Sequence, residues 1–422
     1  MELTEQLSDL LGWPVADLDR MLGGASRETW SFTARGRELV ARRDPPGAPR
    51  GGTMALEAAL LQAARQAGVP VPEVLARTGD MLVMERLHGE TIARRILRDG
   101  EYASARAALT GQCATALARL HTGVHGVPGL PAEPDPLATL RDLLDVAGGP
   151  HPALELGLLR LARDRPPPTG TAVVHGDFRL GNLMVGAAGL VGVLDWELAH
   201  LGDPAEDLGW LCVRSWRFGG PLPVAGVGTY TDLLDAYAAA GGTPVSAATL
   251  RWWEAYGTLR WALLCTRQAA AHLSGAVRSV ELAAIGRRTC EVELDLLDLI
   301  APAPITAPRL DPAPPAGPHD RPTAAELAAA VGEWIAGLPL TGRDAFLARV
   351  AGNVLGTVQR ELALGPELAR RHQARLAGLG VTGDVDLAAQ VRAGRDDEAT
   401  VAAIRDSVVD KLVVADPKQL SR

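Results

Sequence analysis

Three polar residues near the middle of the chain have the types and the spacing that phosphoryl transfer from ATP needs. Asp177 is followed five residues later by Asn182, and a further thirteen residues on by Asp195, with apolar segments on both sides. One carboxylate can accept the proton of an acceptor hydroxyl, while an amide oxygen and a second carboxylate can hold Mg²⁺ against the phosphates. The spacing therefore predicts Asp177 as the catalytic base, and Asn182 and Asp195 as Mg²⁺ ligands.

Neighbouring polar residues are given structural roles. We expect His175 to hydrogen-bond the backbone near Asp195 rather than to carry protons. Asp203 stands before a proline and is expected to start a turn and a helix, and Asp207 is expected to brace the catalytic loop. Two interpretations of Glu197 stay open, a place in the metal shell and plain solvation.

A small sheet with one helix is predicted ahead of these residues. Residues 22–32 have the pattern of a strand, a turn of small residues and a second strand, and residues 38–42 form a third. Residues 53–68 carry apolar side chains at helical spacing, and residues 81–84 form a short buried strand. Such a sheet can support a nucleotide.

Four residues of this sheet and helix are candidates for binding the nucleotide. Gly24 and Ser26 lie in the turn of small residues, where backbone amides can approach phosphates, although a plain hairpin turn has the same composition. Arg42 stands where a kinase places its phosphate-binding lysine; Arg43 follows it, and strand alternation points one of the two inward. We predict Arg42, with Glu57 on the helix orienting it; a surface salt bridge is the alternative for Glu57.

Adenine and the acceptor are expected at other elements. The segment from Glu85 to Leu87 follows the buried strand and is predicted to offer its main chain to adenine. Aromatic and basic residues of the helical region 203–299 are candidates for contacting the acceptor, namely Trp216, Arg217, Trp253, Tyr256 and Arg260. Aromatic side chains at helical spacing are more often part of a core, so a structural role is the alternative for this set.

Composition limits the functional class. The net charge of -8 argues against a nucleic-acid-binding protein. The sequence contains no apolar run long enough for a membrane span, and its first residues lack the features of a signal peptide. The four cysteines form no C-x-x-C pair, which favours reduced thiols and a cytoplasmic location.

With 422 residues, the chain is long enough for two or three domains. We expect a nucleotide-binding lobe at residues 1–88 and a helical catalytic and substrate lobe at residues 89–300. Residues 301–322 contain eight prolines and are expected to form a linker. Residues 323–422 are expected to form a separate domain of four or five helices, which begins with a capping box.

The segments Val174–Asn182, Leu194–Glu197 and Gly202–Leu208 resemble those of the aminoglycoside phosphotransferase family, which phosphorylates small molecules. The similarity spans roughly residues 10–300. It implies an α+β, two-lobed protein-kinase-like fold with a small N-terminal antiparallel sheet plus helix and a large, mostly helical lobe, followed here by a separate all-α domain.

Within that family, Val40–Gly47 and Ser215–Gly219 resemble a subgroup allied to the kinase domains fused to acyl-CoA dehydrogenases. Those domains phosphorylate hydroxy-acyl substrates, and the subgroup commonly has arginine where other kinases have the phosphate-binding lysine. The last 100 residues look similar to an uncharacterised helical domain that is sometimes appended to such kinases.

These observations predict an ATP- and Mg²⁺-dependent phosphotransferase acting on a hydroxyl of a small molecule, either a hydroxy-acyl or an aminoglycoside-like compound. The choice between ATP and GTP stays open. One alternative is a nucleotide-binding pseudokinase scaffold whose helical tail docks a partner. A protein acceptor is a third interpretation, but no activation segment or A-P-E triplet follows Asp195. The C-terminal helical domain is a candidate surface for self-association or for a protein partner.

Overall fold

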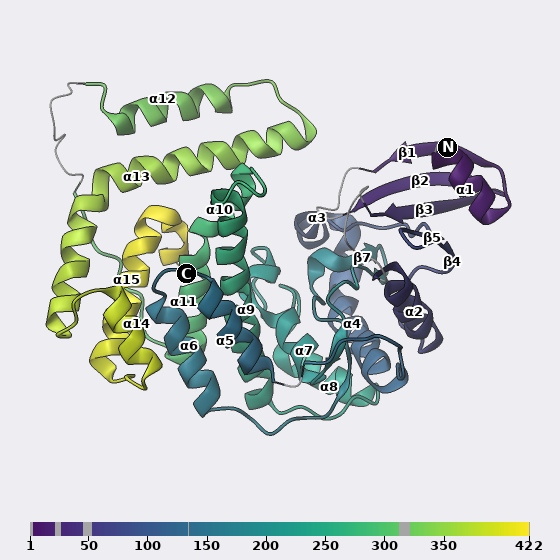
Figure 1. The fold of residues 1–422 in the computed structure, drawn as a ribbon, viewed down its shortest axis with the longest axis horizontal. Coiled ribbons are helices and arrows are strands. Elements are labelled where there is room, and N and C mark those ends of the chain that lie inside the picture. The colour runs from purple at the N-terminus through teal and green to yellow at the C-terminus, as the bar shows by residue number, and fades with distance from the viewer. Residues whose placement is uncertain (1–2, 22–26, 45–52, 134, 312–320, 422) are drawn as a thin grey trace. The chain divides into compact units, whose positions relative to one another are not determined.

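The computed structural model describes residues 3–21, 27–44, 53–133, 135–311 and 321–421. The chain divides into two compact units (Figure 1). The first unit consists of residues 1–134 and 166–254, and the second consists of residues 135–165 and 255–422. No helix in the described part of the chain is both long enough and apolar enough to cross a membrane.

The first unit begins with a helix and a five-stranded antiparallel sheet in the order β1-β2-β3-β5-β4. The helices and strands of this region are α1 (Leu3–Leu11), β1 (Val15–Arg20), β2 (Glu28–Ala34), β3 (Arg37–Arg43), α2 (Thr53–Gln66), β4 (Val74–Arg77) and β5 (Met81–Glu85). Strand β5 is buried on both faces, because Met81 and Val83 pack in the cluster that contains α1, while Leu82 and Met84 pack in the cluster that contains α2.

Alternation along β3 decides which arginine faces α2. Leu39 and Ala41 belong to the α1 cluster, whereas Val40 packs against the α2 cluster. Side chains two residues apart in a strand point the same way, so Arg42 shares the face of Val40. Arg43 therefore points to the opposite face.

Helices and two small two-stranded sheets complete the first unit. Its helical elements are α3 (Ala93–Arg98), η1 (Gly100–Tyr102), α4 (Ala103–Gly123), η2 (Leu180–Asn182), α7 (Ala205–Cys212), η3 (Arg214–Arg217) and α8 (Tyr230–Ala239). Antiparallel pairs are formed by β6 (Ala172–Val174) with β9 (His200–Gly202), and by β7 (Leu183–Gly186) with β8 (Gly189–Val193). These short strands hold both ends of the segment that carries Asp177 and Asn182.

The second unit is built from helices. They are α5 (Pro136–Val146), α6 (Pro152–Arg163), α10 (Val280–Arg287), α11 (Thr289–Ile300), α12 (Ala324–Ala336), α13 (Gly342–Gly378), α14 (Asp384–Arg392), α15 (Glu398–Ala415) and η4 (Pro417–Ser421). Helix α9 (Ala247–Leu273) begins in the first unit and ends in the second. Leu156, Leu294, Val391 and Leu412 are central to the core. Gly157 allows α6 to approach α11, because a Cβ there would lie 2.5 Å from Leu296.

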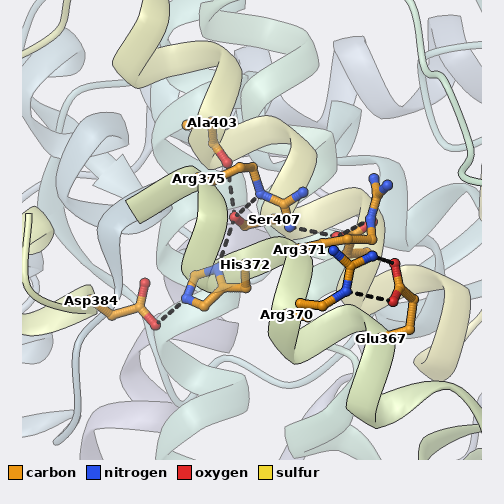
Figure 2. A network of polar contacts seen from close by, with 9 residues as sticks. Glu367, Arg370, Arg371, His372, Arg375, Asp384, Ala403 and Ser407 are labelled. Carbon is orange, nitrogen blue, oxygen red and sulfur yellow. Dashed lines mark hydrogen bonds and ion pairs between the residues drawn. The ribbon is translucent and has the colours of Figure 1, made fainter. Parts of the chain in front are cut away.

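A polar network fastens the C-terminal part of α13 to α14 and α15, as Figure 2 shows. The two ring nitrogens of His372 bond Ser407 Oγ at 3.1 Å and Asp384 Oδ2 at 3.0 Å. Arg375 donates to Ser407 and to the buried carboxylate of Asp410, and Arg371 contacts the same carboxylate. This half of α13 is thus anchored by charged hydrogen bonds.

The predicted fold class is confirmed, with an N-terminal antiparallel sheet, a helical region and an all-helical tail. The first strand, β1, lies earlier than predicted, and part of the predicted 22–32 pattern is outside the described residues. Within the described residues 321–421, the C-terminal region contains four α-helices, where four or five are expected. Residues 301–311 of the expected linker have no regular structure. The predicted domain boundaries divide the chain into consecutive segments, and they stay a prediction.

Candidate active site

The loop that carries Asp177 is held by a buried carboxylate from α7. Asp207 accepts hydrogen bonds from the amides of His175, at 2.7 Å, and Gly176, at 2.9 Å. Its Oδ2 also lies 3.1 Å from His121 Nε2. Burial alone would raise the pKa of this carboxyl, but the bond and charge of His121 keep it below its usual value. The predicted role of Asp207 as a brace is confirmed.

The turn at Gly176 requires glycine. Its φ is 75°, and a Cβ would lie 2.4 Å from the carbonyl oxygen of Leu198. The close approach of these two backbone segments directs the chain from β6 into the position of Asp177. A side chain at residue 176 would push the loop away from Leu198.

His175 has the structural role that the sequence predicts. Its Nδ1 accepts a hydrogen bond from the Asp177 amide at 3.2 Å, which leaves Nε2 to donate to the carbonyl of Leu194 at 3.0 Å. Burial lowers the pKa of the imidazole. A neutral ring therefore links the residue that precedes Asp195 to the backbone of Asp177.

Three side-chain donors converge on the carboxylate of Asp177. Asn182 Nδ2 lies 2.6 Å from Oδ2, while Arg179 Nε and Trp210 Nε1 lie 2.9 Å and 2.8 Å from Oδ1. Because Asn182 uses its NH₂ group here, its amide oxygen is the atom that remains for a cation. Two of the three residues predicted from spacing are therefore in direct contact.

Trp216 belongs to the surroundings of this carboxylate. The guanidinium of Arg179 lies 4.8 Å from the centre of the Trp216 ring, and the ring centroids of Trp216 and Trp210 are 5.4 Å apart. Trp216 thus packs against both donors to Asp177 Oδ1, Arg179 and Trp210. Trp216 is one of the predicted acceptor residues, and its direct partner is Arg179.

Asp195 lies next to Asn182 through the backbone. The amide of Leu194 donates to the carbonyl of Asn182 at 2.9 Å. Asp195 has a φ of 65°, a left-handed conformation that is uncommon for residues other than glycine and tends to occur at functional sites. Its carboxylate is 39% exposed and lies 3.7 Å from Arg42 Nη2. A carboxylate oxygen and an amide oxygen are therefore available on neighbouring segments, as an Mg²⁺ site requires.

A second set of charged residues joins β3 to α2. Glu57 is 4% exposed and accepts from Arg42 Nη1 at 2.5 Å, as the sequence predicts. It also forms an ion pair with Arg27, which in turn donates to Asp44 Oδ1 at 2.9 Å. Burial opposes the charge of Arg27, but Glu57 and Asp44 raise its pKa above the usual value. Arg43 faces the other way and bonds Glu28 at 2.7 Å.

Sequence reasoning missed Arg27, Arg179 and Trp210. The sequence carries no local signal for Arg27, because the burial of Asp44 and Glu57, which requires a second cation beside Arg42, is known only from the structure. Arg179 stands two residues after Asp177, and this proximity was its signal. No local pattern distinguishes Trp210, whose indole reaches Asp177 across 33 residues of sequence.

The residues predicted for the nucleotide have different outcomes. Gly24 and Ser26 lie outside the described residues. The amide of Glu85 donates to the carbonyl of Glu73 at 2.9 Å, so this group is already bonded. The amide of Leu87 has no hydrogen-bond partner among the described residues. At this segment, Leu87 is therefore the residue with a donor to offer to adenine.

The other predicted acceptor residues have structural contacts. Arg217 donates to the carbonyl of Cys212 and to Glu254 at 2.7 Å. Trp253 is 4% exposed and packs against Gly209, where a Cβ would lie 2.5 Å away. Tyr256 and Arg260 belong to the second unit, and Tyr256 is buried. Their contact with an acceptor stays a prediction.

A buried histidine stands between two glutamates at the start of β9. The ligand atoms of Glu133, His200 and Glu206 lie within 4.8 Å of one another, the arrangement that a metal ion could share. His200 Nδ1 lies 2.9 Å from the carbonyl of Leu198, and Nε2 lies 3.1 Å from Glu206. Burial disfavours the protonated form of His200, but the carboxylates of Glu133 and Glu206 favour it and raise the pKa of His200 to about 10. A protonated imidazole thus already balances this cluster.

Two family models match the chain. The phosphotransferase enzyme family (APH) matches residues 17–256, a range that contains Arg42, Glu57 and the whole Asp177 loop. A domain of unknown function (DUF6285) matches residues 339–419 in the C-terminal helices.

Two curated relatives carry the name of acyl-CoA dehydrogenase. Family member 10 of mouse (Mus musculus) is 30% identical over 213 residues, which are 45% of this chain and 20% of the mouse protein. Family member 11 of chicken (Gallus gallus) is 30% identical over 207 residues, which are 44% of this chain and 26% of the chicken protein. The chain therefore matches much less than two thirds of either relative.

The fold also occurs among solved structures. A protein of Ralstonia eutropha JMP134, provisionally named an aminoglycoside phosphotransferase, superposes with a TM-score of 0.56. The identity is 20%, and the match covers 71% of this chain and 97% of that structure. At this identity the likeness shows the kinase-like fold.

Proposed function

The chain belongs to the phosphotransferase enzyme family, whose members phosphorylate small molecules, and we propose that it transfers the γ-phosphate of ATP to a hydroxyl group with the help of Mg²⁺. The observation that carries the proposal is the contact between Asp177 and Asn182, at 2.6 Å, beside the backbone bond that brings Asp195 to Asn182. The proposed base and the two proposed oxygen ligands for Mg²⁺ thus lie on one short stretch of connected backbone. Phosphoryl transfer depends mainly on this kind of positioning.

In this proposal Asp177 accepts the proton of the acceptor hydroxyl as that oxygen attacks the γ-phosphorus, and the bond from this phosphorus to the β,γ-bridging oxygen breaks to release ADP. Asn182 and Asp195 would hold Mg²⁺, which would neutralise charge on the phosphates. Arg42 binds phosphate oxygens with its planar guanidinium, and Glu57 keeps it oriented. The main-chain amide of Leu87 binds the adenine ring.

We propose that the acceptor is a hydroxy-acyl compound. Support comes from the names of the two curated relatives, both acyl-CoA dehydrogenase family members, and from the arginine in place of lysine at residue 42. An aminoglycoside-like acceptor is the competing choice. The surroundings of Trp216 and Arg179 are the part of the first unit in which we expect the acceptor to bind.

One observation favours the alternative of a nucleotide-binding scaffold without transfer activity. Arg42 lies 3.7 Å from Asp195, so the carboxylate intended for Mg²⁺ has a cation beside it. If this pairing persists with nucleotide bound, ATP would bind without Mg²⁺. The C-terminal helices would then bind the partner of the scaffold.

Nucleotide binding and transfer distinguish these functions. The thermal midpoint should rise with Mg²⁺-ATP more than with ATP alone, and a ligand at 100 times its Kd stabilises by about 2.7 kcal/mol. The difference should vanish in an Asp195→Asn variant. Transfer is then measured with labelled ATP and a panel of 3- and 4-hydroxyacyl thioesters beside aminoglycosides, with Asp177→Asn as the inactive control. Two results together would refute the kinase proposal in favour of the scaffold. They are a thermal midpoint with ATP that does not depend on Mg²⁺, and no labelled acceptor.

A further inference from the structure

The first two helices of the C-terminal region form a hairpin with an open groove. Helices α12 and α13 lie side by side (Figure 1), and the groove along them has a volume of about 790 Å³. Many of its lining residues are small, namely Ala328, Gly332, Ala336, Ala348, Gly352 and Gly356. Small residues leave room for another helix to approach closely.

This hairpin exposes large apolar side chains. On α12, Leu327, Val331 and Trp334 are 54%, 48% and 67% exposed, and their spacing places them on one face. No residue of α12 is buried. An amphipathic helix gains most of its stability by burying its apolar face, and large exposed apolar patches mark interaction surfaces.

Helix α13 differs between its two halves. Its C-terminal half is fastened by the polar network of Figure 2. Its N-terminal half carries Phe346 and Val358, which are 42% and 39% exposed. Leu362, just past the middle of α13, is 48% exposed as well, so the exposed apolar surface continues from α12 along α13 as far as this residue.

Charges on the hairpin indicate what covers it. Helix α12 contains Glu326 and Glu333 and no basic residue, whereas residues 342–360 of α13 contain three arginines and one aspartate. Glu333 and Arg349 both line the groove, and neither side chain has an ion pair or hydrogen bond within the described chain. An acidic helix and a basic helix thus lie on the same surface of one chain.

We propose that the α12–α13 hairpin is the surface on which a second copy of this chain docks, around a two-fold axis. A two-fold interface is self-complementary, so that each acidic α12 meets the basic half of the other α13. Glu333 of one copy then pairs with Arg349 of the other, and Trp334 fills the groove of the opposite copy. The product is a four-helix bundle made from two hairpins.

Charge reversal on the full-length chain tests this pairing. By sedimentation equilibrium, the wild type should have twice the chain mass of 44.3 kDa at micromolar concentration. Glu333→Arg and Arg349→Glu should each raise the dimer dissociation constant at least tenfold, because each places like charges opposite one another twice. The double variant restores both pairs and should return to within about threefold of the wild type. Glu367→Arg, which reverses a charge outside the groove, is the matched control.

Other results would overturn the proposal. They are a wild type that stays monomeric up to 100 µM, single variants with unchanged dimerisation, and a double variant no better than the singles. Leu327→Ser provides a second test without charge, and it should also weaken the dimer. Mg²⁺-ATP binding should not change in any of these variants. A change in nucleotide affinity without a change in mass would mean that the groove is covered by the chain's own first unit.

Discussion

Replacing Glu57 by Gln tests whether the charged network between β3 and α2 holds the nucleotide site. Glu57 is almost fully buried and serves two arginines, Arg42 and Arg27. Gln keeps the size of the side chain but removes its charge. Arg27 would keep its ion pair with Asp44 at 2.9 Å, and Arg42 would keep its ion pair with the more exposed Asp195 at 3.7 Å.

The structure sets the size of the expected loss. Removing one partner of a buried ion pair typically costs about 3–5 kcal/mol, since a buried charge is left without compensation. The bond from Arg27 to Asp44 lessens this penalty, so we expect a loss of about 3 kcal/mol. Glu73→Gln is the matched control beside the same sheet: Glu73, just before β4, pairs with Arg37 of β3, and both side chains are more than 40% exposed. An exposed pair of this kind contributes about 0–1 kcal/mol.

Hydrogen exchange read by mass spectrometry measures this loss locally, because the chain has two units and a single unfolding curve would mix them. Exchange of peptides from β3 and α2 should become about 100-fold faster in Glu57→Gln, since 1.4 kcal/mol corresponds to a factor of ten. Affinity for Mg²⁺-ATP should fall as well. If β3 and α2 exchange no faster than in Glu73→Gln, the network does not support this part of the site.

The remaining predictions concern the catalytic loop and its surroundings. Asp177→Asn should lower the transfer rate by about 10²–10⁴-fold with Mg²⁺-ATP affinity retained, and a variant that keeps wild-type turnover would remove Asp177 as the base. Trp210→Phe keeps an aromatic ring but removes the donor to Asp177 Oδ1, so turnover should fall about tenfold without a change in nucleotide affinity; equal turnover would mean that this bond is dispensable. His200→Gln should cost roughly 3–5 kcal/mol of unfolding free energy near pH 6.5. The pKa of His200 is raised to about 10 in the folded chain, so its contribution is complete below the unfolded pKa and is lost as pH rises through 10. Denaturation of both proteins at pH 6.5 and 10.5, followed by a probe in the first unit, checks this, and a constant difference would contradict it.

Local patterns in the sequence predict the parts of the fold that depend on periodicity. Helix α2 was expected at residues 53–68 and occupies Thr53–Gln66. Strand alternation also predicted that only one of Arg42 and Arg43 points inward, and Arg42, chosen for its kinase-like position, is the one that lies beside Glu57. Both inferences need only the geometry of one helix or strand. Boundaries are less certain, as the earlier start of β1 shows.

Contacts between distant parts of the sequence could not be predicted in this way. The segment 135–165 belongs to the same unit as the C-terminal helices, because apolar residues of α6 pack with residues of α11, α14 and α15. The periodicity of α6 predicts that one of its faces is buried, but it does not predict which helices pack against that face. The same limit applies to Arg27 and Trp210, whose roles depend on which carboxylate the fold brings near them.

The three donors around Asp177 determine which of its oxygens can act as the base in the proposed reaction. A carboxylate has about four lone-pair sites, two on each oxygen. Arg179 and Trp210 occupy both sites on Oδ1, whereas Asn182 occupies one site on Oδ2. The acceptor hydroxyl must therefore bond Oδ2, the same oxygen that Asn182 contacts. In the proposed reaction, Asn182 would hold Mg²⁺ through its amide oxygen and would also orient the basic oxygen through its NH₂ group. Substituting Asn182 should consequently impair both metal affinity and proton transfer, whereas substituting Trp210 should impair transfer alone.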